Sequence, residues 1–345
     1  MIGFEEFKLI SWNVRGALYA NGKLAIRELV RSKKPDVFIL METRCQFRRV
    51  SAFWNSLGFF PIHIEEARGF SGGIWVLANT SVPYNFRVID THQQVVTFEV
   101  WKDNLTWVCS AVYASPIPAN REILWRHMTL LRRRFLLPWL LLGDFNEILF
   151  PSEVRGGDFL PNRAAMFASV LDTCQLVDLG AVGRRFTWFR KANDRLILSK
   201  RLDRALGDME WKVAFPDAVV DVLNRVHSDH CPILLQCGSP QTLAHNRPFR
   251  FLAAWADHPD FAAVVDNAWR SGEECITSKL ERVREASTVF NKEVFGNIFR
   301  RKRHVEARLR GVQRELDRRV TSDMVLFEAE LQREYRNILR QEELL

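Results

Sequence analysis

Short apolar segments that end in a polar side chain recur along the chain up to about residue 238, and they constrain the fold more than any other feature. In the clearest one, residues 139–146 (WLLLGDFN), a run of leucines ends in Asp144 and Asn146. Residues two apart in a strand point to the same side. If a strand ends near Gly143, both side chains project from its carboxyl edge, although a simple turn also accommodates Gly-Asp and Phe-Asn.

The same arrangement occurs in six segments of this region. The polar residues at their ends are Asn13, Glu42, Tyr113, Asp144, Asp203 and the pair Asp229 and His230. In open α/β sheets, sites lie at the carboxyl edge of the strands. One polar strand end is ordinary, but six in one region indicate a site assembled from strand ends.

The apolar segments predict packed sheets. FKLISWNV, DVFILMET and LTWVCSAVY are apolar or β-rich and are bounded by polar residues, as strands are. Helices are predicted over residues 22–34, 120–134 and 163–175. Some strands are apolar throughout and others alternate, which favours sheets packed on each other with helices outside.

The chain changes character after Gly238. Its 345 residues exceed the roughly 250 residues that are common for one α/β domain, so we expect a large domain with an appendage. The stretch GSPQTLAHNRPFRF looks like a linker, and helical sequence follows it. We therefore expect a domain at residues 1–238, a linker at 239–255 and a basic helical extension at 256–345.

The extension contains an amphipathic helix with apolar residues at spacings of four and three. These residues are Val305, Leu309, Val312 and Leu316. It could form a hairpin with residues 323–343, or make a helix–helix contact with a partner. Residues 300–319 hold nine Lys/Arg and three acids, a net charge of +6. That charge fits a solvated face, a nucleic-acid contact or a nuclear-import signal at RRKR.

Overall charge points to a polyanionic partner. The net charge is +8 and the pI about 9.4, which favours nucleic acid first and an anionic membrane second. The N-terminus lacks the pattern of a secretory signal. The longest apolar run, Phe135 to Leu142, is broken by Pro138 and is too short to span a bilayer. We expect an intracellular, nuclear protein that binds DNA and no membrane.

The residue types at the strand ends favour a hard metal ion. Oxygen donors dominate, and they are Asn13, Glu42, Asp144, Asn146 and Asp229. Such donors suit Mg²⁺ or Mn²⁺ rather than zinc, and the six cysteines contain no C-x-x-C pair. His230 beside a carboxylate suits acid–base work or a phosphate contact. Metal-assisted hydrolysis of a phosphoester by water fits this inventory best.

The ordered motifs resemble the endonuclease/exonuclease/phosphatase superfamily. More narrowly, they resemble the endonuclease domain of plant non-LTR (long interspersed) retrotransposons. The motifs, which cover about residues 7–236, are SWNVRG, METR, GFSGGIWVLA, LLGDFNEIL with SEVRGG, FTWFR, KRLDRAL, FPDAVV and SDHCPILL. The helical stretch from RPFRFLAAW to FNKEVFGNI also looks like the segment that precedes reverse transcriptase in such elements.

The resemblance implies a role for each residue near the metal. Asn13 and Glu42 would hold it, with Glu42 as the main carboxylate, and Asp229 would lie nearby. Asp144 would activate or position the attacking water. In-line attack on a phosphate needs such a base together with a metal.

A second group of roles concerns the phosphate and the substrate. Asn146 would orient the scissile phosphate, Tyr113 would contact it, and His230, oriented by Asp203, would stabilise charge on its oxygens. Thr187 and Trp188 could face the DNA or the site, with a core position as the alternative for the tryptophan.

Two features depart from the pattern. Some apurinic enzymes carry an acid where Arg15 stands, which puts a second metal ion in doubt; Arg15 could touch a phosphate or be merely exposed. The chain also has no Asp-Asp pair, which the reverse transcriptases of these elements need, so we expect no such activity.

These arguments together predict a four-layer α/β sandwich of two mixed sheets flanked by helices, with a C-terminal helical extension. The predicted activity is a Mg²⁺-dependent DNA endonuclease that leaves a 3′-hydroxyl. One alternative is a phosphatase of the same fold acting on inositol phosphates or phospholipids. The other is a catalytically silent remnant that binds nucleic acid.

Overall fold

A computed structural model gives the fold of most of the chain. It describes residues 7–17, 19–67, 72–193, 195–238, 260–271, 276–290 and 296–343. The chain divides into two compact units, Met1–Pro240 with Gln313–Leu326, and Gln241–Val312 with Phe327–Leu345. The expected linker, 239–255, lies outside the described residues, so the predicted boundaries at 238 and 256 stay predictions.

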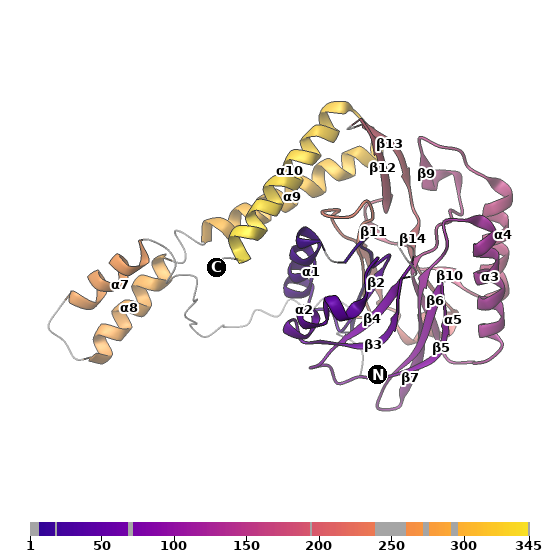
Figure 1. Cartoon of the computed structure of the whole chain (residues 1–345), viewed down its shortest axis with the longest axis horizontal. Coiled ribbons are helices and arrows are strands. Elements are labelled where there is room, and N and C mark those ends of the chain that lie inside the picture. Colours follow the sequence, from indigo (N-terminus) through magenta and orange to yellow (C-terminus); the bar gives the residue numbers. More distant parts are fainter. Residues whose placement is uncertain are drawn as a thin grey trace. The chain divides into compact units, whose positions relative to one another are not determined.

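The first unit contains two large mixed sheets (Figure 1). The seven strands of the first sheet are, in order, β11 (Val182–Gly183), β15 (Val219–Val222), β16 (Ile233–Gln236), β1 (Lys8–Asn13), β2 (Val37–Met41), β4 (Ile74–Asn79) and β3 (Phe59–Glu65). The six strands of the second are β10 (Val177–Asp178), β14 (Asp203–Gly207), β8 (Trp139–Asp144), β7 (Leu105–Tyr113), β6 (Val95–Lys102) and β5 (Asn85–His92). A small sheet is formed by β12 (Trp188–Ala192), β13 (Arg195–Lys200) and β9 (Val154–Arg155).

Helices cover the outer faces of the two large sheets. The helices of this unit are α1 (Ala20–Lys33), α2 (Ser51–Ser56), α3 (Pro118–Arg132), α4 (Pro161–Cys174) and α5 (Met209–Ala214), with the short 3₁₀ turns η1 (Phe47–Arg49) and η2 (Pro151–Glu153). Apolar residues of α1 and α2 pack on the first sheet, and those of α3 and α4 on the second. The predicted four-layer α/β sandwich is therefore confirmed.

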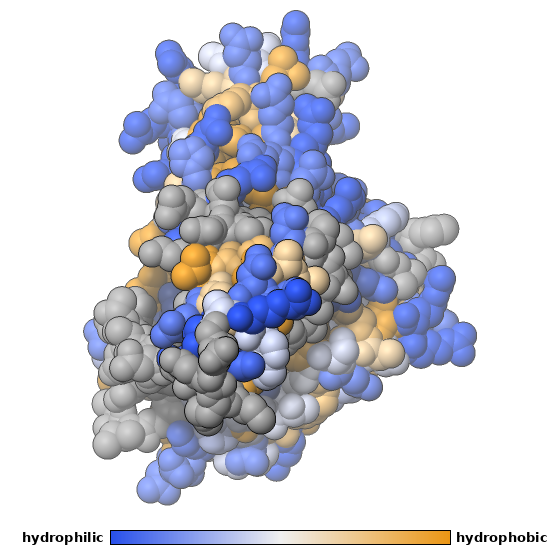
Figure 2. Space-filling view, turned by 90° about the vertical axis from the view of Figure 1, so that its left-hand side faces the viewer, coloured by the Kyte–Doolittle hydropathy of each residue, from blue (hydrophilic) through white to orange (hydrophobic). Residues whose placement is uncertain are grey.

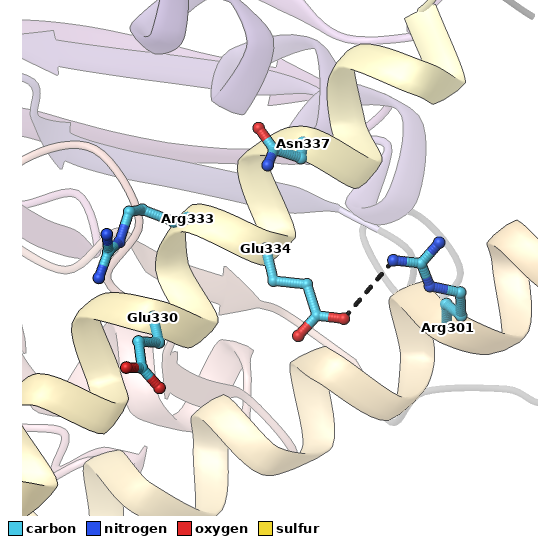
Figure 3. Close-up of a pocket in the computed structure, with 5 residues that line it drawn as sticks. All are labelled: Arg301, Glu330, Arg333, Glu334 and Asn337. Atoms are coloured by element: carbon cyan, nitrogen blue, oxygen red, sulfur yellow. Dashed lines mark ion pairs between the residues drawn. The ribbon is translucent and has the colours of Figure 1, made fainter.

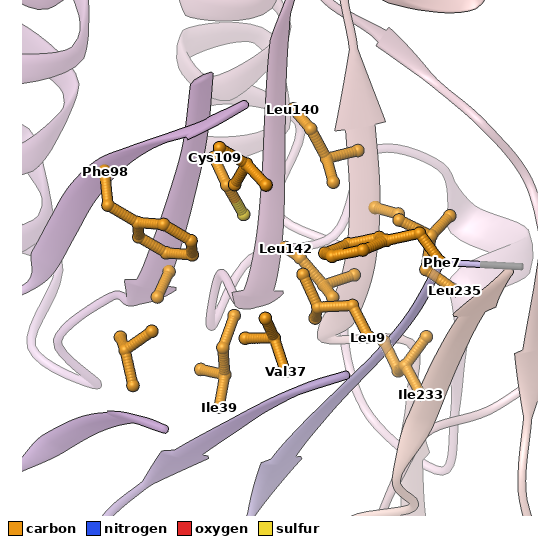
Figure 4. Packing of buried hydrophobic residues seen from close by; sticks show 14 of the residues in the cluster. Phe7, Leu9, Val37, Ile39, Phe98, Cys109, Leu140, Leu142, Ile233 and Leu235 are labelled. Atoms are coloured by element: carbon orange, nitrogen blue, oxygen red, sulfur yellow. The ribbon is translucent and has the colours of Figure 1, made fainter. Parts of the chain in front are cut away.

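The leucine run that opened the sequence argument is buried on both sides. Leu140 and Leu142 belong to the core between the sheets, which Figure 4 shows. Trp139 and Leu141 pack toward α3 and α4. A central strand covered on both faces reads as a continuous apolar run, which explains the lack of alternation.

Gly143 lets this strand reach the site. Its φ is +152°, and a Cβ atom there would lie 1.9 Å from the carbonyl oxygen of Val112 on β7. Only glycine accommodates that backbone and that approach. The result is a parallel β7–β8 pair in which Asp144 lies opposite Tyr113.

The C-terminal part of the chain is helical, as predicted. Its helices are α7 (Phe261–Arg270), α8 (Ile276–Phe290), α9 (Gly296–Arg318) and α10 (Ser322–Glu343). Val305, Leu309 and Leu316 of the predicted repeat are buried. Within the second unit, the Tyr335 hydroxyl donates a hydrogen bond of 2.7 Å to Glu306 Oε1, which joins α9 to α10.

The surface of the helical unit is rich in charge. Exposed arginines occur along α9 and α10, and exposed acids occur on α10. Figure 2, a view of the whole chain coloured by hydropathy, shows hydrophilic residues beside apolar ones. Among the described helices, none combines the length and apolar character needed to cross a membrane. A hollow of about 570 Å³ within the second unit is lined by Arg301, Glu330, Arg333, Glu334 and Asn337 (Figure 3). Arg301 and Glu334 form an ion pair there at 3.6 Å, so this lining largely neutralises itself.

Candidate active site

Strand pairing brings the predicted residues to one edge of the two sheets. β1 and β2 are parallel, with Asn13 opposite Met41, so Asn13 and Glu42 end neighbouring strands of the first sheet. In the second sheet, Asp144 lies opposite Tyr113 on one side and opposite Asp203 on the other. The polar strand ends therefore do converge, as the sequence pattern predicted.

Asp144 lies at the centre and is fully buried. Its Oδ2 accepts hydrogen bonds from Asn13 Nδ2 at 3.0 Å and from Asn146 Nδ2 at 3.3 Å. Its Oδ1 accepts one from the Asn146 backbone N–H at 2.9 Å. Burial, with the neighbouring Asp203 charge, raises the pKa of Asp144 above its ordinary value. A carboxylate with a raised pKa is a stronger base than an exposed one.

Glu42 faces Asp144 from the first sheet, and the Asn13 amide connects them. Asn13 Nδ2 also donates to Glu42 Oε1 at 3.3 Å, and the Tyr113 hydroxyl donates to the same oxygen at 2.9 Å. The guanidinium groups of Arg44 and Arg15 pair with Oε2. Burial alone would raise the pKa of Glu42, but these donors and cations hold it below its usual value, so the carboxylate stays charged.

His230 is held by two carboxylates. Its Nδ1 lies 2.9 Å from Asp203 Oδ2, and its Nε2 lies 3.7 Å from Asp144 Oδ2. Burial acts to lower the pKa of the imidazole, but the charges of Asp203 and Asp144 outweigh it and raise the pKa to about 9. His230 is therefore a buried cation at neutral pH.

Several site residues adopt a left-handed backbone conformation. Their φ angles are +47° at Arg15, +50° at Glu42, +52° at Arg44 and +48° at Asn146. Residues other than glycine rarely adopt this region, and such strain gathers at functional sites. The four residues follow directly on strands β1, β2 and β8 or close behind them, so the strand ends turn sharply to aim their side chains.

Asn146 and Thr187 are engaged by the protein itself. The Asn146 amide donates to Ala114 O at 2.8 Å as well as to Asp144. Thr187 is fully buried, and its hydroxyl accepts hydrogen bonds from the backbone N–H groups of Leu202 and Asp203 at 3.0 and 2.9 Å. These contacts orient Asp144 and Asp203 rather than present a side chain to solvent.

Asp229, Trp188 and Arg15 form a group at the rim. Trp188 Nε1 donates to Asp229 Oδ2 at 3.0 Å, and the Arg15 guanidinium pairs with the same oxygen. The Arg15 side chain is 43% exposed, and it bridges Asp229 and Glu42. Arg15 thus adds positive charge where some apurinic enzymes carry an acid.

Sequence reasoning missed two contributors. Arg44 pairs with Glu42, and its place within the METR motif was the available signal. Ser228 Oγ accepts a hydrogen bond from the His230 backbone N–H at 3.1 Å. The serine lies within SDH, two residues before the histidine, which is the spacing of a local side-chain turn.

The chemistry of the donor set fits a hard divalent cation beside Glu42. Two carboxylates, Glu42 and Asp144, flank the Asn13 amide, and oxygen donors of this kind are the ligands that Mg²⁺ prefers. Among the described residues, Asp144, Asp203 and His230 also have ligand-type atoms within 4.8 Å of one another. Protonated His230 has no lone pair to offer a metal, however, and metal binding requires the neutral ring. The Glu42 side is therefore the better metal site.

A cavity of about 460 Å³ adjoins Tyr113. It is lined by Glu65, Glu66, Gly72, Gly73, His92, Gln93, Gln94, Tyr113, Ser115, Pro116, Asn120 and Ile123. Its described lining contains two acids and no lysine or arginine, so it disfavours a phosphate. Neutral amides beside apolar Pro116 and Ile123 suit a flat, hydrogen-bonding group.

The sequence profile of the Endonuclease/Exonuclease/phosphatase family matches residues 10–239. The chain belongs to this family. Its members are hydrolases that act on phosphodiesters, and they typically use a divalent metal ion. The superfamily expected from the motifs is thereby confirmed. The comparison with curated protein sequences found no match.

Solved structures share the family fold at low sequence identity. The AP endonuclease LMAP from Leishmania major is 16% identical with a TM-score of 0.54, covering 68% of this chain and 89% of that one. The endonuclease domain of TRAS1, a telomere-specific non-LTR retrotransposon, is 14% identical with a TM-score of 0.52, covering 67% and 97%. An AP endonuclease from Archaeoglobus fulgidus is 15% identical with a TM-score of 0.51, covering 66% and 98%. At these identities the likeness establishes the fold.

Proposed function

We propose that this family member is a Mg²⁺-dependent endonuclease that nicks DNA and leaves a 3′-hydroxyl, and that it derives from a non-LTR retrotransposon. Mn²⁺ would serve in place of Mg²⁺. The observation that carries the proposal is the Asp144–His230–Asp203 group. It sets a buried carboxylate with a raised pKa beside a buried imidazolium.

In this proposal Asp144 positions the attacking water and takes its proton. The hydrogen bonds from Asn13 and Asn146 fix the carboxylate. A fixed base holds the water in line with the phosphorus, so the water does not have to reach the phosphate by diffusion. Asn146 acts chiefly by orienting Asp144.

His230 stabilises the charge that develops on the nonbridging phosphate oxygens. Its Nδ1 is committed to Asp203, so Nε2–H is the donor left for the phosphate. A preoriented cation in a buried site stabilises such charge more than water does. Tyr113, whose hydroxyl donates to Glu42 in the free protein, would contact the same phosphate by donating that proton to a phosphate oxygen instead.

Glu42 and Asn13 would hold the metal ion, with Asp229 nearby. A bound divalent cation neutralises charge on the phosphate and favours ionisation of a nearby water. Arg15 and Arg44 now balance the charge of Glu42. Because these cations and a bound metal ion repel one another, one metal ion fits beside Glu42 more readily than two metal ions.

Three observations favour DNA over a small phosphoester. The net charge of +8 suits a polyanion. The described lining of the cavity beside Tyr113 contains no lysine or arginine, which an inositol phosphate would need, and its neutral amides suit a nucleoside. The solved structures quoted above are described as AP and retrotransposon endonucleases. The retrotransposon motifs and the TRAS1 likeness support the proposed origin, and nuclear localisation would follow from DNA as the substrate.

The test is nicking of a supercoiled plasmid by the purified chain, with Mg²⁺, with a chelator, and with Asp144→Ala. We expect metal-dependent nicking that falls by several orders of magnitude in the variant, and nicks that a polymerase can extend. Asp172→Ala, an exposed acid on α4, is the matched control. An effect of Asp144→Ala below about tenfold, or ~1.4 kcal/mol, would contradict its role.

Failure of nicking would discriminate between the alternatives. Turnover of inositol phosphates or phospholipids by a folded chain that leaves plasmid intact would indicate a phosphatase of this fold. DNA binding with a steep salt dependence but no cleavage would indicate a silent binding remnant.

A further inference from the structure

One face of the last turn of α9 is buried within the first unit. Gln313, Leu316 and Asp317 are each at most 7% exposed, whereas Arg314 and Arg318 on the opposite face are exposed. Residues 313–326 belong to the same compact unit as residues 1–240. This turn lies beyond residue 239, where the family profile ends, so the shared fold does not account for it.

Asp317 makes both side-chain and backbone contacts with the segment that leads into β12. Arg184 Nη2 lies 3.3 Å from Asp317 Oδ1 and donates to Gln313 O at 3.4 Å. The Arg185 backbone N–H donates to Asp317 Oδ2 at 3.0 Å. The Arg184 side chain is only 2% exposed, so its charge depends on this partner.

Gln313 connects the same turn to the segment before His230. Its Nε2 donates to Arg225 O at 3.2 Å. The guanidinium groups of Arg184 and Arg225 lie 4.3 and 4.7 Å from the centre of the Phe189 ring. Phe189 belongs to an apolar cluster with Phe186, Val222 and Cys231.

Between these contacts lies Thr187, which is hydrogen-bonded to the backbone beside both members of the Asp203–His230 pair. Its hydroxyl accepts from the backbone N–H groups of Leu202 and Asp203, and its carbonyl accepts from Cys231 N at 2.8 Å. Trp188 forms a β-bridge with His230. The segment 184–189 therefore touches the backbone on both sides of the Asp203–His230 pair.

We propose that the end of α9 supports the active site, with Asp317 and Gln313 as positioning residues that hold segment 184–189 and, through Thr187, Asp203 and His230. The physical reason is that a buried arginine without its carboxylate must move toward water, and catalytic geometry tolerates only small displacements. The last turn of α9 would then be part of the enzyme rather than an appendage. The kinetic part of the test rests on the proposed nicking activity, and the spectroscopic part does not.

The experiment compares Asp317→Ala and Asp317→Asn with Arg314→Ala, an exposed neighbour in the same turn. In an assay that measures nicking of an oligonucleotide duplex, we expect Asp317→Ala to lower kcat by about tenfold or more. We expect KM to change by less than about threefold. Asp317→Asn keeps an acceptor for the Arg185 N–H and should retain more activity. In NMR spectra of the full chain, the His230 imidazole resonance should move in both Asp317 variants and stay in place in Arg314→Ala.

A double variant distinguishes loss of active-site geometry from general unfolding. Arg184→Met with Asp317→Leu replaces the buried ion pair by apolar side chains, which is often tolerated. It should recover the His230 resonance and part of kcat relative to Asp317→Ala. A folded Asp317→Ala chain with unchanged kcat and an unmoved His230 resonance overturns the proposal. If the wild-type chain does not nick DNA, the endonuclease proposal fails, and the His230 resonance alone decides this one.

Discussion

At the residue scale, the charge on His230 should set the alkaline limit of activity. Its pKa is raised to about 9, because Asp203 and Asp144 outweigh the opposing effect of burial. The imidazolium is present below that pKa and is lost as the pH rises through it, so nicking should decline above about pH 9.

Asp203→Asn removes the first of these charges, so the decline should start about 1–3 pH units lower. A pH–rate profile checked by NMR titration of His230 measures this, and Asp217→Asn, on the surface, is the control. An alkaline limit that stays in place in Asp203→Asn would show that His230 does not set it.

Single residues also show how far sequence reasoning reaches. The convergence of Asn13, Glu42 and Asp144 was predictable, because polar residues at the ends of apolar strands share one edge. The use of each hydrogen bond was not predictable. The Asn146 amide donates to Ala114 O and Asp144 Oδ2. These contacts depend on loop geometry that the spacing of residues in the sequence does not predict. Nor was it predictable that Arg121 of α3 is buried in a 2.8 Å ion pair with Glu147.

At the element scale, the fold of β8 depends on Gly143. Gly143→Ala would place a methyl group 1.9 Å from Val112 O at a φ of +152°. Because the clash is with backbone atoms, it can be relieved only by moving β7 or β8. We expect a loss of about 3 kcal/mol or more in the free energy of unfolding.

Denaturant unfolding of the full chain measures the effect of Gly143→Ala. Gly311→Ala is the control, because a Cβ there meets nothing within 4 Å and lies inside α9. That substitution should stabilise the helix by up to about 1 kcal/mol. Equal stability of Gly143→Ala and the wild type would mean that β7 and β8 do not need this close approach.

The predictable elements were those with a strong period or a long apolar run. The expected helices at 120–134 and 163–175 are α3 and α4, each beginning at a proline that suits a first helical turn. β3 carries Pro61 and a register shift, and β5 is a half-exposed edge strand with its own shift. Both lie at the edge of their sheet. Because a register shift interrupts the alternation of side chains and an edge strand is only partly buried, neither a local pattern nor propensity reveals them.

At the scale of the whole molecule, the basic residues of α9 and the acid at the end of that helix differ in their surroundings. The sequence placed the basic residues of 300–319 on one amphipathic helix, and the structure confirms the helix. It could not show that Asp317, at the end of this helix, is buried within the first unit, since a single acid in a basic run looks like a charge-balancing surface residue. The fold therefore recruits one buried acid from a segment whose composition suggests only solvent or DNA.

Stability of the first unit should depend on pH through a buried ionic network. Glu153, 8% exposed, pairs with Arg204 at 2.9 Å and with Arg201 at 2.8 Å, and both arginines also pair with Asp178. Burial acts to raise the pKa of Glu153, but Arg204 and its other partners hold it below the ordinary 4.5. A carboxylate with a lowered folded-state pKa stabilises the fold fully above its unfolded pKa, and that contribution is lost as the pH falls toward the folded pKa.

Glu153→Gln should therefore destabilise the chain by about 3 kcal/mol at pH 7, because it leaves Arg204 buried with a lost partner. The gap between wild type and variant should narrow as the pH falls below 4.5, where the wild-type carboxylate begins to lose its advantage. Denaturant unfolding at several pH values measures both free energies, with exposed Glu210→Gln as the control. A gap that stays constant from pH 7 to pH 3 would show that Arg204 is satisfied by its other partners and that the charge of Glu153 contributes nothing.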